Sequence, residues 1–161
     1  MRKAVALALI AVAAPLAAKE SLGVFSDWGA FRDSKVPRCY AIAAPAASAA
    51  RREFDAFATI GTWPRRKIRG QVHFRLSRQK APAAQVTLVV GRSSFRLTGG
   101  GADAWAQDRT MDAAILAAMR STPRMSVRST DRSGRRFSDS YSLAGAASAI
   151  DAATLGCARV R

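Results

Sequence analysis

Hydrophobic and polar residues alternate most clearly across residues 71–77. Val72, Phe74 and Leu76 fall on one side of an extended chain, and the polar residues between them fall on the other. An alternation with a period of two predicts a half-buried β-strand. Further strands are predicted at 22–31, 38–43, 85–90, 94–98, 125–130 and 135–141. In 54–63 the large apolar residues recur at a helical spacing of three, but Thr59, Gly61 and Thr62 favour a strand in its second half.

A helical period appears twice, both times late in the chain. From Asp108 to Arg120, apolar residues recur at a spacing of four, with Asp108 or Thr110 available as the N-cap and Pro123 as the stop. We expect a second helix from Ser142, as its cap, to about Cys157. The residues expected on its buried face are Leu143, Ala147, Ile150, Thr154 and Cys157.

Many strands in series, followed by two helices, define the expected architecture. The pattern predicts a mainly β domain with β-sandwich-like antiparallel sheets and two helices, the last one C-terminal, in the α+β class. The 143 residues from 19 to 161 are enough for a single domain.

The first 18 residues have a different character. Arg2 and Lys3 precede the apolar run 4–14, and the small residues Ala17-Ala18 precede the polar pair 19–20. This order is typical of a secretory signal peptide, and we expect cleavage after Ala18. An uncleaved anchor is the alternative, although the run is shorter than the about 20 residues of a spanning helix. No later apolar run is long enough to cross a membrane. The sequence therefore predicts a periplasmic or secreted protein of the bacterial cell envelope.

The chain has two cysteines, Cys39 and Cys157. In an exported protein, an even cysteine count favours a disulfide, which would tie the start of the fold to its end. Two free buried thiols are the alternative. Two cysteines and one histidine do not make a zinc site, so we expect neither a metal nor a cofactor.

The formal net charge is +15. Such a charge favours polyanionic partners, but the arginine-rich and alanine-rich composition would also follow from a GC-rich genome. The basic residues gather in two connections, which are the candidate anion-binding sites: Arg65, Arg66, Lys67 and Arg69, then Arg132, Arg135 and Arg136. If the fold brought both connections to the same end, one strongly basic surface would result.

Candidate catalytic groups are few. His73 is the only histidine, and the alternation places it on the polar side of its strand. The chain lacks a Gly-x-Ser-x-Gly nucleophile elbow, and its aspartates mostly fall at turns or helix starts. The sequence therefore predicts no catalytic residues.

Three pieces of the chain resemble the invasion-associated locus B family of exported bacterial proteins. Asp27-Trp28 followed by Cys39 is similar to the family's Gly-Asp-Trp and downstream cysteine. Residues 115–141 resemble its helix, arginine, short strand, glycine turn and strand. The Ser-Leu-Ala-Gly of 142–145, with the Ala-Ile of 149–150, resembles the start of its last helix.

The chain also departs from that family. Ala146 stands where the family has phenylalanine, the extra cysteines are missing, and the middle of the chain is unusually basic. The resemblance implies a remote member: a small, mostly β envelope or secreted protein without a cofactor. It does not imply a reaction.

Three functions follow as expectations, in order. The first is a non-enzymatic envelope protein that binds or packs against other envelope components. The second is a basic anion-binding module for lipopolysaccharide, acidic lipid or nucleic acid. The third and least favoured is an exported hydrolase.

Overall fold

The computed structural model describes residues 19–48 and 51–158, so the predicted signal peptide 1–18 lies outside it. Within this part, ten strands and two α-helices follow one another. The strands are β1 (Glu20–Phe25), β2 (Trp28–Asp33), β3 (Arg38–Ala43), β4 (Phe57–Trp63), β5 (Ile68–Arg75), β6 (Val86–Val90), β7 (Ser93–Gly100), β8 (Asp103–Trp105), β9 (Arg124–Thr130) and β10 (Arg136–Ser142). The helices are α1 (Arg109–Met119), α2 (Ala146–Ala158) and the short 3-10 helix η1 (Pro64–Arg66).

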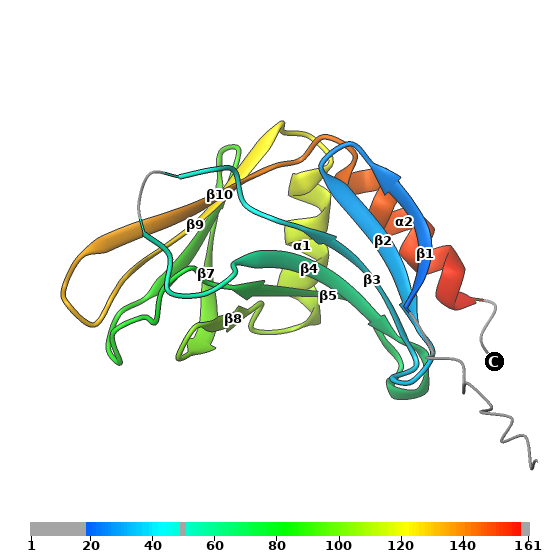
Figure 1. Ribbon diagram of the computed structural model, residues 1–161, viewed down its shortest axis with the longest axis horizontal. Helices are drawn as coiled ribbons and strands as arrows, with labels where there is room; N and C mark the ends of the chain where they lie inside the picture. The colour runs from blue at the N-terminus through cyan, green and yellow to red at the C-terminus, as the bar shows by residue number, and fades with distance from the viewer. Residues whose placement is uncertain (1–18, 49–50, 159–161) are drawn as a thin grey trace, which may run out of the picture.

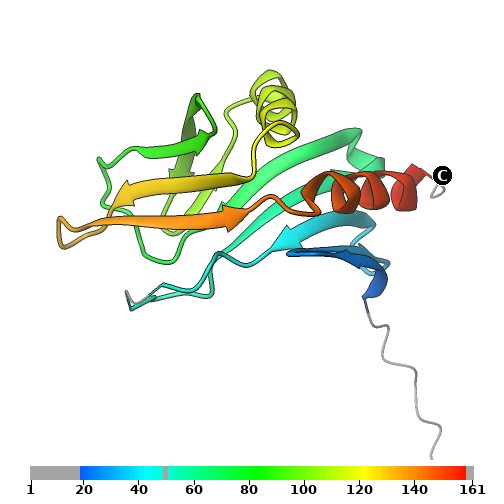
Figure 2. The ribbon, with the colours of Figure 1, turned by 90° about the horizontal axis from the view of Figure 1, so that it is seen from above.

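All neighbouring strands pair antiparallel, in the order β1-β2-β3-β4-β5-β8-β7-β6-β9-β10. The sheet is strongly curled, as Figures 1 and 2 show. Its two halves meet inside, where the rings of Phe74 in β5 and Tyr141 in β10 have centroids 5.8 Å apart. Helix α2 packs on β1 to β4, and α1 packs on β5 to β7. The predicted fold class is confirmed.

Helix α2 begins later than the sequence predicts. Strand β10 continues through Ser142, and the helix starts at Ala146, so Ser142 is not its N-cap. The Ser142 hydroxyl instead accepts the N–H of Ala144, and its carbonyl accepts the indole N–H of Trp28 at 2.9 Å. Gly145 turns the chain with φ +81°, and a Cβ there would collide with the carbonyl of Phe25. Close packing against the first hairpin therefore sets the start of the helix.

The buried face of α2 is rotated slightly from the predicted one. Ile150 and Cys157 are buried as expected, but Thr154 is exposed and Ala147 is only half-buried. The side chains that contact the sheet are mostly alanines, since the buried residues are Ala146, Ala149, Ile150, Ala153 and Cys157. These small residues let the helix lie close to β2 and β3.

The predicted strand 22–31 is in fact a hairpin of β1 and β2. The chain reverses at Ser26, which has φ +49° without being glycine, and the next N–H, that of Asp27, bonds to the carbonyl of Ala144. The run of three glycines at 99–101 also belongs largely to the sheet. Gly99 and Gly100 end β7, and only Gly101 lies in the turn to the short strand β8.

The predicted disulfide is confirmed. Cys39 in β3 and Cys157 in the last turn of α2 are bonded, with their Cα atoms 5.7 Å apart, and both residues are buried. Among the described residues, no helix combines the length and the hydropathy needed to cross a bilayer. The same residues contain no group of three or more His, Cys, Asp or Glu side chains arranged to hold a metal ion.

Candidate anion-binding cleft

Three segments that are distant in the sequence meet at one end of the molecule. They are 51–54 before β4, 77–79 after β5, and 131–139 around the β9–β10 turn. Ser77 joins all three: its carbonyl accepts the N–H groups of Glu53 and Phe54, and its own N–H donates to the buried carboxylate of Asp139 at 2.8 Å. Because these bonds involve the backbone, the position of each segment is fixed by the others.

Five arginines line the hollow between these segments, and we call it the arginine cleft. They are Arg51, Arg52, Arg78, Arg135 and Arg136. The main cavity has a volume of about 460 Å³, and a second cavity of about 210 Å³ shares three of the five arginines with it. The volume falls within the range of small-ligand sites.

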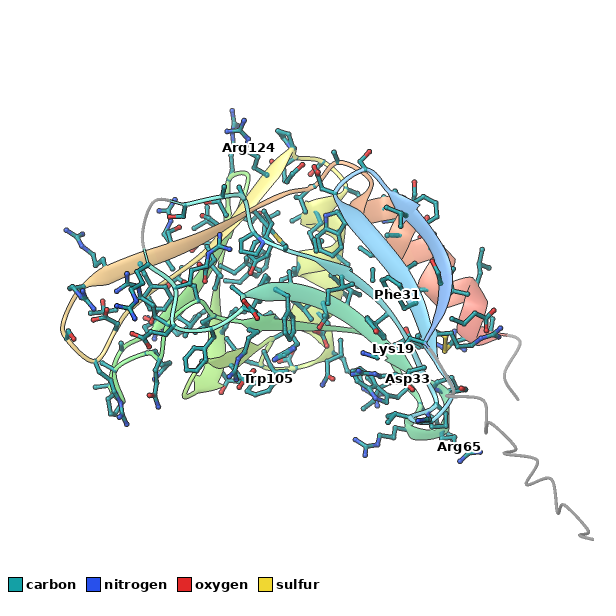
Figure 3. All side chains as sticks on the ribbon, viewed as in Figure 1. Lys19, Phe31, Asp33, Arg65, Trp105 and Arg124 are labelled. Atoms are coloured by element: carbon teal, nitrogen blue, oxygen red, sulfur yellow. A yellow bond between two sulfur atoms is a disulfide. The ribbon has the colours of Figure 1, made fainter. Side chains whose placement is uncertain are left out.

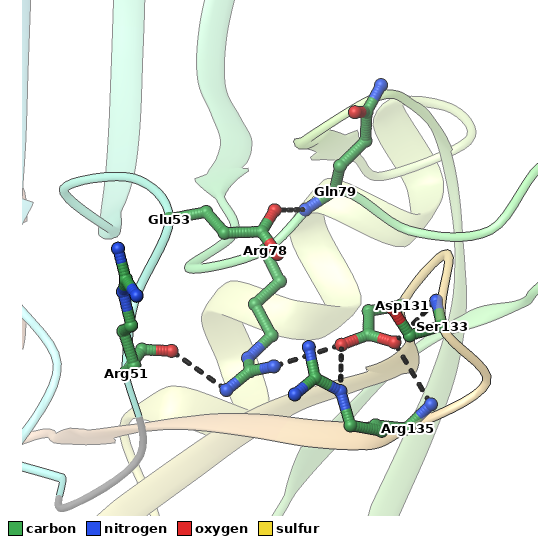
Figure 4. Close-up of polar contacts among 7 residues, drawn as sticks. All are labelled: Arg51, Glu53, Arg78, Gln79, Asp131, Ser133 and Arg135. Carbon is green, nitrogen blue, oxygen red and sulfur yellow. Dashed lines mark hydrogen bonds and ion pairs between the residues drawn. The ribbon is translucent and has the colours of Figure 1, made fainter.

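Asp131 organises one wall of the cleft (Figure 4). One carboxylate oxygen accepts the backbone N–H groups of Ser133 and Arg135, which fixes the turn. The other accepts the guanidinium groups of Arg78 at 2.9 Å and Arg135 at 3.2 Å. Burial alone would raise the pKa of Asp131, but these hydrogen bonds and the charge of Arg135 hold it below its ordinary value. Asp131 is therefore a structural anion that orients two arginines.

The other acidic groups near the cleft are also engaged. Asp139 accepts from Ser77, and Glu53 accepts the N–H of Gln79 at 3.2 Å. The guanidinium groups of Arg51 and Arg136, in contrast, have no ion-pair partner in the described part of the chain. Arg52 donates to a backbone carbonyl, that of Ala46, and forms no ion pair with another described residue.

Positive charge therefore exceeds negative charge in the cleft. The Arg135 side chain is 64% exposed in spite of its bond to Asp131. Exposed guanidinium groups present planar forks of N–H donors, which match the oxygens of phosphate or carboxylate. The arrangement can hold an anionic group from several directions.

The structure separates the two basic clusters that the sequence singled out. Arg132, Arg135 and Arg136 lie at the β9–β10 turn, and Arg135 and Arg136 belong to the cleft. The cluster of residues 65–69 lies around η1 at the opposite end of the long axis, as Figures 1 to 3 show. The single surface of seven charges is not formed.

Sequence reasoning missed three residues of the cleft: Arg51, Arg52 and Arg78. The adjacent pair 51–52 is a visible basic signal, but it lies outside the two basic clusters that the sequence analysis selected. Its role depends on the meeting of loops that are far apart in the chain, as in the bond from Arg78 to the carbonyl of Arg51, 27 residues earlier. Local patterns do not carry that information.

His73 lies on the outer side of β5, as predicted, but it is not simply solvated. Its ring stacks on Trp105 with centroids 5.0 Å apart, and its Nε2 lies 3.0 Å from a carboxylate oxygen of Asp103. Its Nδ1 lies 3.4 Å from the hydroxyl of Thr59. The order Thr59, His73, Asp103 resembles the nucleophile, base and acid of a catalytic triad. Thr59, however, sits in the middle of β4, between β3 and β5, where ladder pairing engages the backbone donors that an oxyanion would need.

The chain was compared with known proteins in three ways: no family model, no curated protein and no solved structure matches it.

Proposed function

We propose that this protein is an exported, non-enzymatic anion-binding protein of the bacterial cell envelope, periplasmic or secreted, and that the arginine cleft is its binding site. One observation carries the proposal. Five arginines from three separate segments converge on two cavities that share Arg51, Arg52 and Arg78, while the carboxylates beside them are engaged by backbone N–H groups or by Arg78 and Arg135. The pattern of residues 1–18 and the disulfide support export.

The ligand chemistry that suits the cleft is a phosphate group carried by a sugar. Forked guanidinium groups recognise phosphate oxygens, and a cavity of about 460 Å³ holds a phosphorylated sugar but not a nucleic-acid duplex. Lipopolysaccharide carries such groups and is the source that we favour. Remote membership of the invasion-associated locus B family is part of the same proposal, and it rests on the motifs described above.

The test is binding of a soluble probe, the delipidated phosphorylated core oligosaccharide of lipopolysaccharide, measured by calorimetry. The variant Arg51→Ala/Arg136→Ala removes two guanidinium groups without an ion-pair partner in the described part of the chain. The matched control, Arg92→Ala/Arg124→Ala, removes the same charge from exposed positions outside the cleft.

We expect the cleft variant to bind at least about tenfold more weakly than the wild type at low salt, with a smaller dependence on salt, since fewer counterions are released. The control should bind like the wild type. Equal weakening in both variants would mean that only net charge matters, and absence of binding by the wild type would end the proposal.

A further inference from the structure

The end of the molecule opposite the cleft is also strongly basic. It comprises the start of β1, the β2–β3 turn, η1 and the start of β5, and Figure 3 labels Lys19, Asp33 and Arg65 there. We call it the basic end. Its eight basic residues are Lys19, Arg32, Lys35, Arg38, Arg65, Arg66, Lys67 and Arg69.

Two carboxylates lie among these cations, and both are engaged. Glu20 accepts three hydrogen bonds from two nitrogens of the Arg32 guanidinium group, at 2.6 to 2.8 Å. One oxygen of Asp33 accepts the N–H groups of Lys35 and Val36 at 3.2 Å, and the other lies 4.0 Å from Nε of Arg38. These acids therefore stabilise the hairpins rather than neutralise the rest of the surface.

Five cations remain uncompensated within the described part of the chain. They have exposed positions and no ion pair there: Lys35, Arg65, Arg66, Lys67 and Arg69. They come from two parts of the chain that lie next to each other, since one cavity is lined both by Arg65 and by residues 32–34, 37 and 38, which flank Lys35 in the β2–β3 connection. A second cavity, of about 550 Å³, opens beside Lys67 and Arg69, a volume suited to a lipid head group.

An exposed apolar side chain stands among these charges. Val36 is 50% exposed at the β2–β3 turn, directly after Lys35. An exposed aliphatic side chain in a basic turn does not stabilise the protein as long as the turn is surrounded by water. At a membrane interface it would enter the acyl boundary while its neighbours contact the head groups.

The start of the described chain lies at the same end. Lys19 precedes β1 there, with its ammonium group 6.0 Å from the ring centroid of Tyr40, and the apolar run 4–14 comes shortly before it in the sequence. If residues 1–18 are removed, the new α-amino group adds a further positive charge to this surface.

From these observations we infer that the basic end docks on the surface of an anionic lipid bilayer. The β9–β10 turn, which carries one wall of the arginine cleft, lies at the other end of the long axis (Figures 1 and 2), so the cleft then stays away from the membrane and open to its ligand. This inference concerns a different surface from the proposed function, and either can fail without the other.

The test is co-sedimentation of the protein, as recovered from the cell envelope, with vesicles. One set contains phosphatidylcholine alone, and the other contains about a third phosphatidylglycerol. Each basic residue near an anionic surface strengthens binding about fivefold. We therefore expect Arg65→Ala/Arg66→Ala/Arg69→Ala to weaken binding to the anionic vesicles about a hundredfold, and Val36→Ser to weaken it severalfold.

Two controls separate this surface from general charge and from the cleft. Arg92→Ala/Arg96→Ala/Arg124→Ala removes the same charge from exposed positions on other elements and should leave vesicle binding within about threefold. Arg51→Ala/Arg136→Ala should bind vesicles normally while losing the oligosaccharide. Equal binding to both vesicle types, or equal loss in the two triple variants, would overturn the inference.

Discussion

The Cys39–Cys157 disulfide should contribute a large part of the stability of the fold. It joins β3, in the first half of the sheet, to the last turn of α2, across a sequence separation of 118 residues. The perturbation is Cys39→Ala/Cys157→Ala, which removes the bond without leaving a free thiol. Both residues are buried, so the substitution also removes some packing between helix and sheet.

The length of the loop that the disulfide closes determines how much unfolding free energy is lost when the bond is removed. In the chain-entropy model, closing a loop of this size lowers the entropy of the unfolded chain by about 16 cal/mol/K, or about 5 kcal/mol at 25 °C. A domain of this size has a total unfolding free energy of about 5–15 kcal/mol, so the loss is severe. With a urea dependence of about 2 kcal/mol/M, the midpoint should fall by about 2.5 M.

The assay is urea unfolding of the oxidised wild type and the double variant, monitored by tryptophan fluorescence and far-UV circular dichroism. Hydrogen exchange at residues 153–157 provides a second readout, because the bond also holds the end of α2 on β3. A midpoint shift below about 0.5 M, with unchanged exchange at the helix end, would refute the reasoning. It would mean that the unfolded chain is already restricted without the bond.

Four further predictions concern three buried polar groups. Asp112 in α1 accepts the buried N–H of Val72 at 2.8 Å, so Asp112→Ala should cost about 1–3 kcal/mol. Burial and the charge of Asp108 raise the pKa of Asp112 in spite of the bond from Val72. Ionisation therefore opposes folding as the pH rises through that pKa, and Asp112→Asn should be at least as stable as wild type at pH 7 in urea unfolding. Burial raises the pKa of Tyr141, and its hydroxyl has no hydrogen-bond partner among the described residues. Tyr141→Phe should therefore raise the melting temperature or leave it unchanged, and a fall of several degrees would contradict this. The pKa of Asp131 in the folded protein lies below the ordinary value of 3.8. Ionised Asp131 therefore stabilises the fold fully above pH 3.8, and this stabilisation is lost as the pH falls through the pKa of the folded state. The difference in unfolding free energy between the wild type and Asp131→Asn should therefore become smaller at acid pH. A difference that stays constant from pH 7 to pH 2 would show that ionised Asp131 does not stabilise the fold.

Elements with a strong local pattern were predictable from the sequence. The strand of residues 38–43 matches β3 at both ends, and Asp108 caps α1 by accepting the N–H of Met111. In each case the pattern and the local chemistry agree with the tertiary environment. The disulfide was predicted from the expected export of the chain and from the cysteine count.

Elements set by contacts between distant segments were not predictable. The first hairpin turns at Ser26, a residue that rarely adopts positive φ, and this turn packs against Ala144 and Gly145 more than 100 residues away. Strand β8 has only three residues, too few for a visible alternation. The arginine cleft belongs to the same class, because its residues are brought together by backbone bonds through Ser77 rather than by spacing.

The most direct test of the central claim is to locate the bound anion by NMR. Isotope-labelled protein is titrated with the delipidated phosphorylated core oligosaccharide, and backbone amide shifts are followed. We predict saturable shifts at Ser77, Ser133 and Arg135, whose N–H groups bond to the carboxylates in and beside the cleft, and none at Val36 or Lys67. Shifts confined to Val36 and Lys67, or no shifts anywhere, would contradict the assignment of the arginine cleft as the binding site.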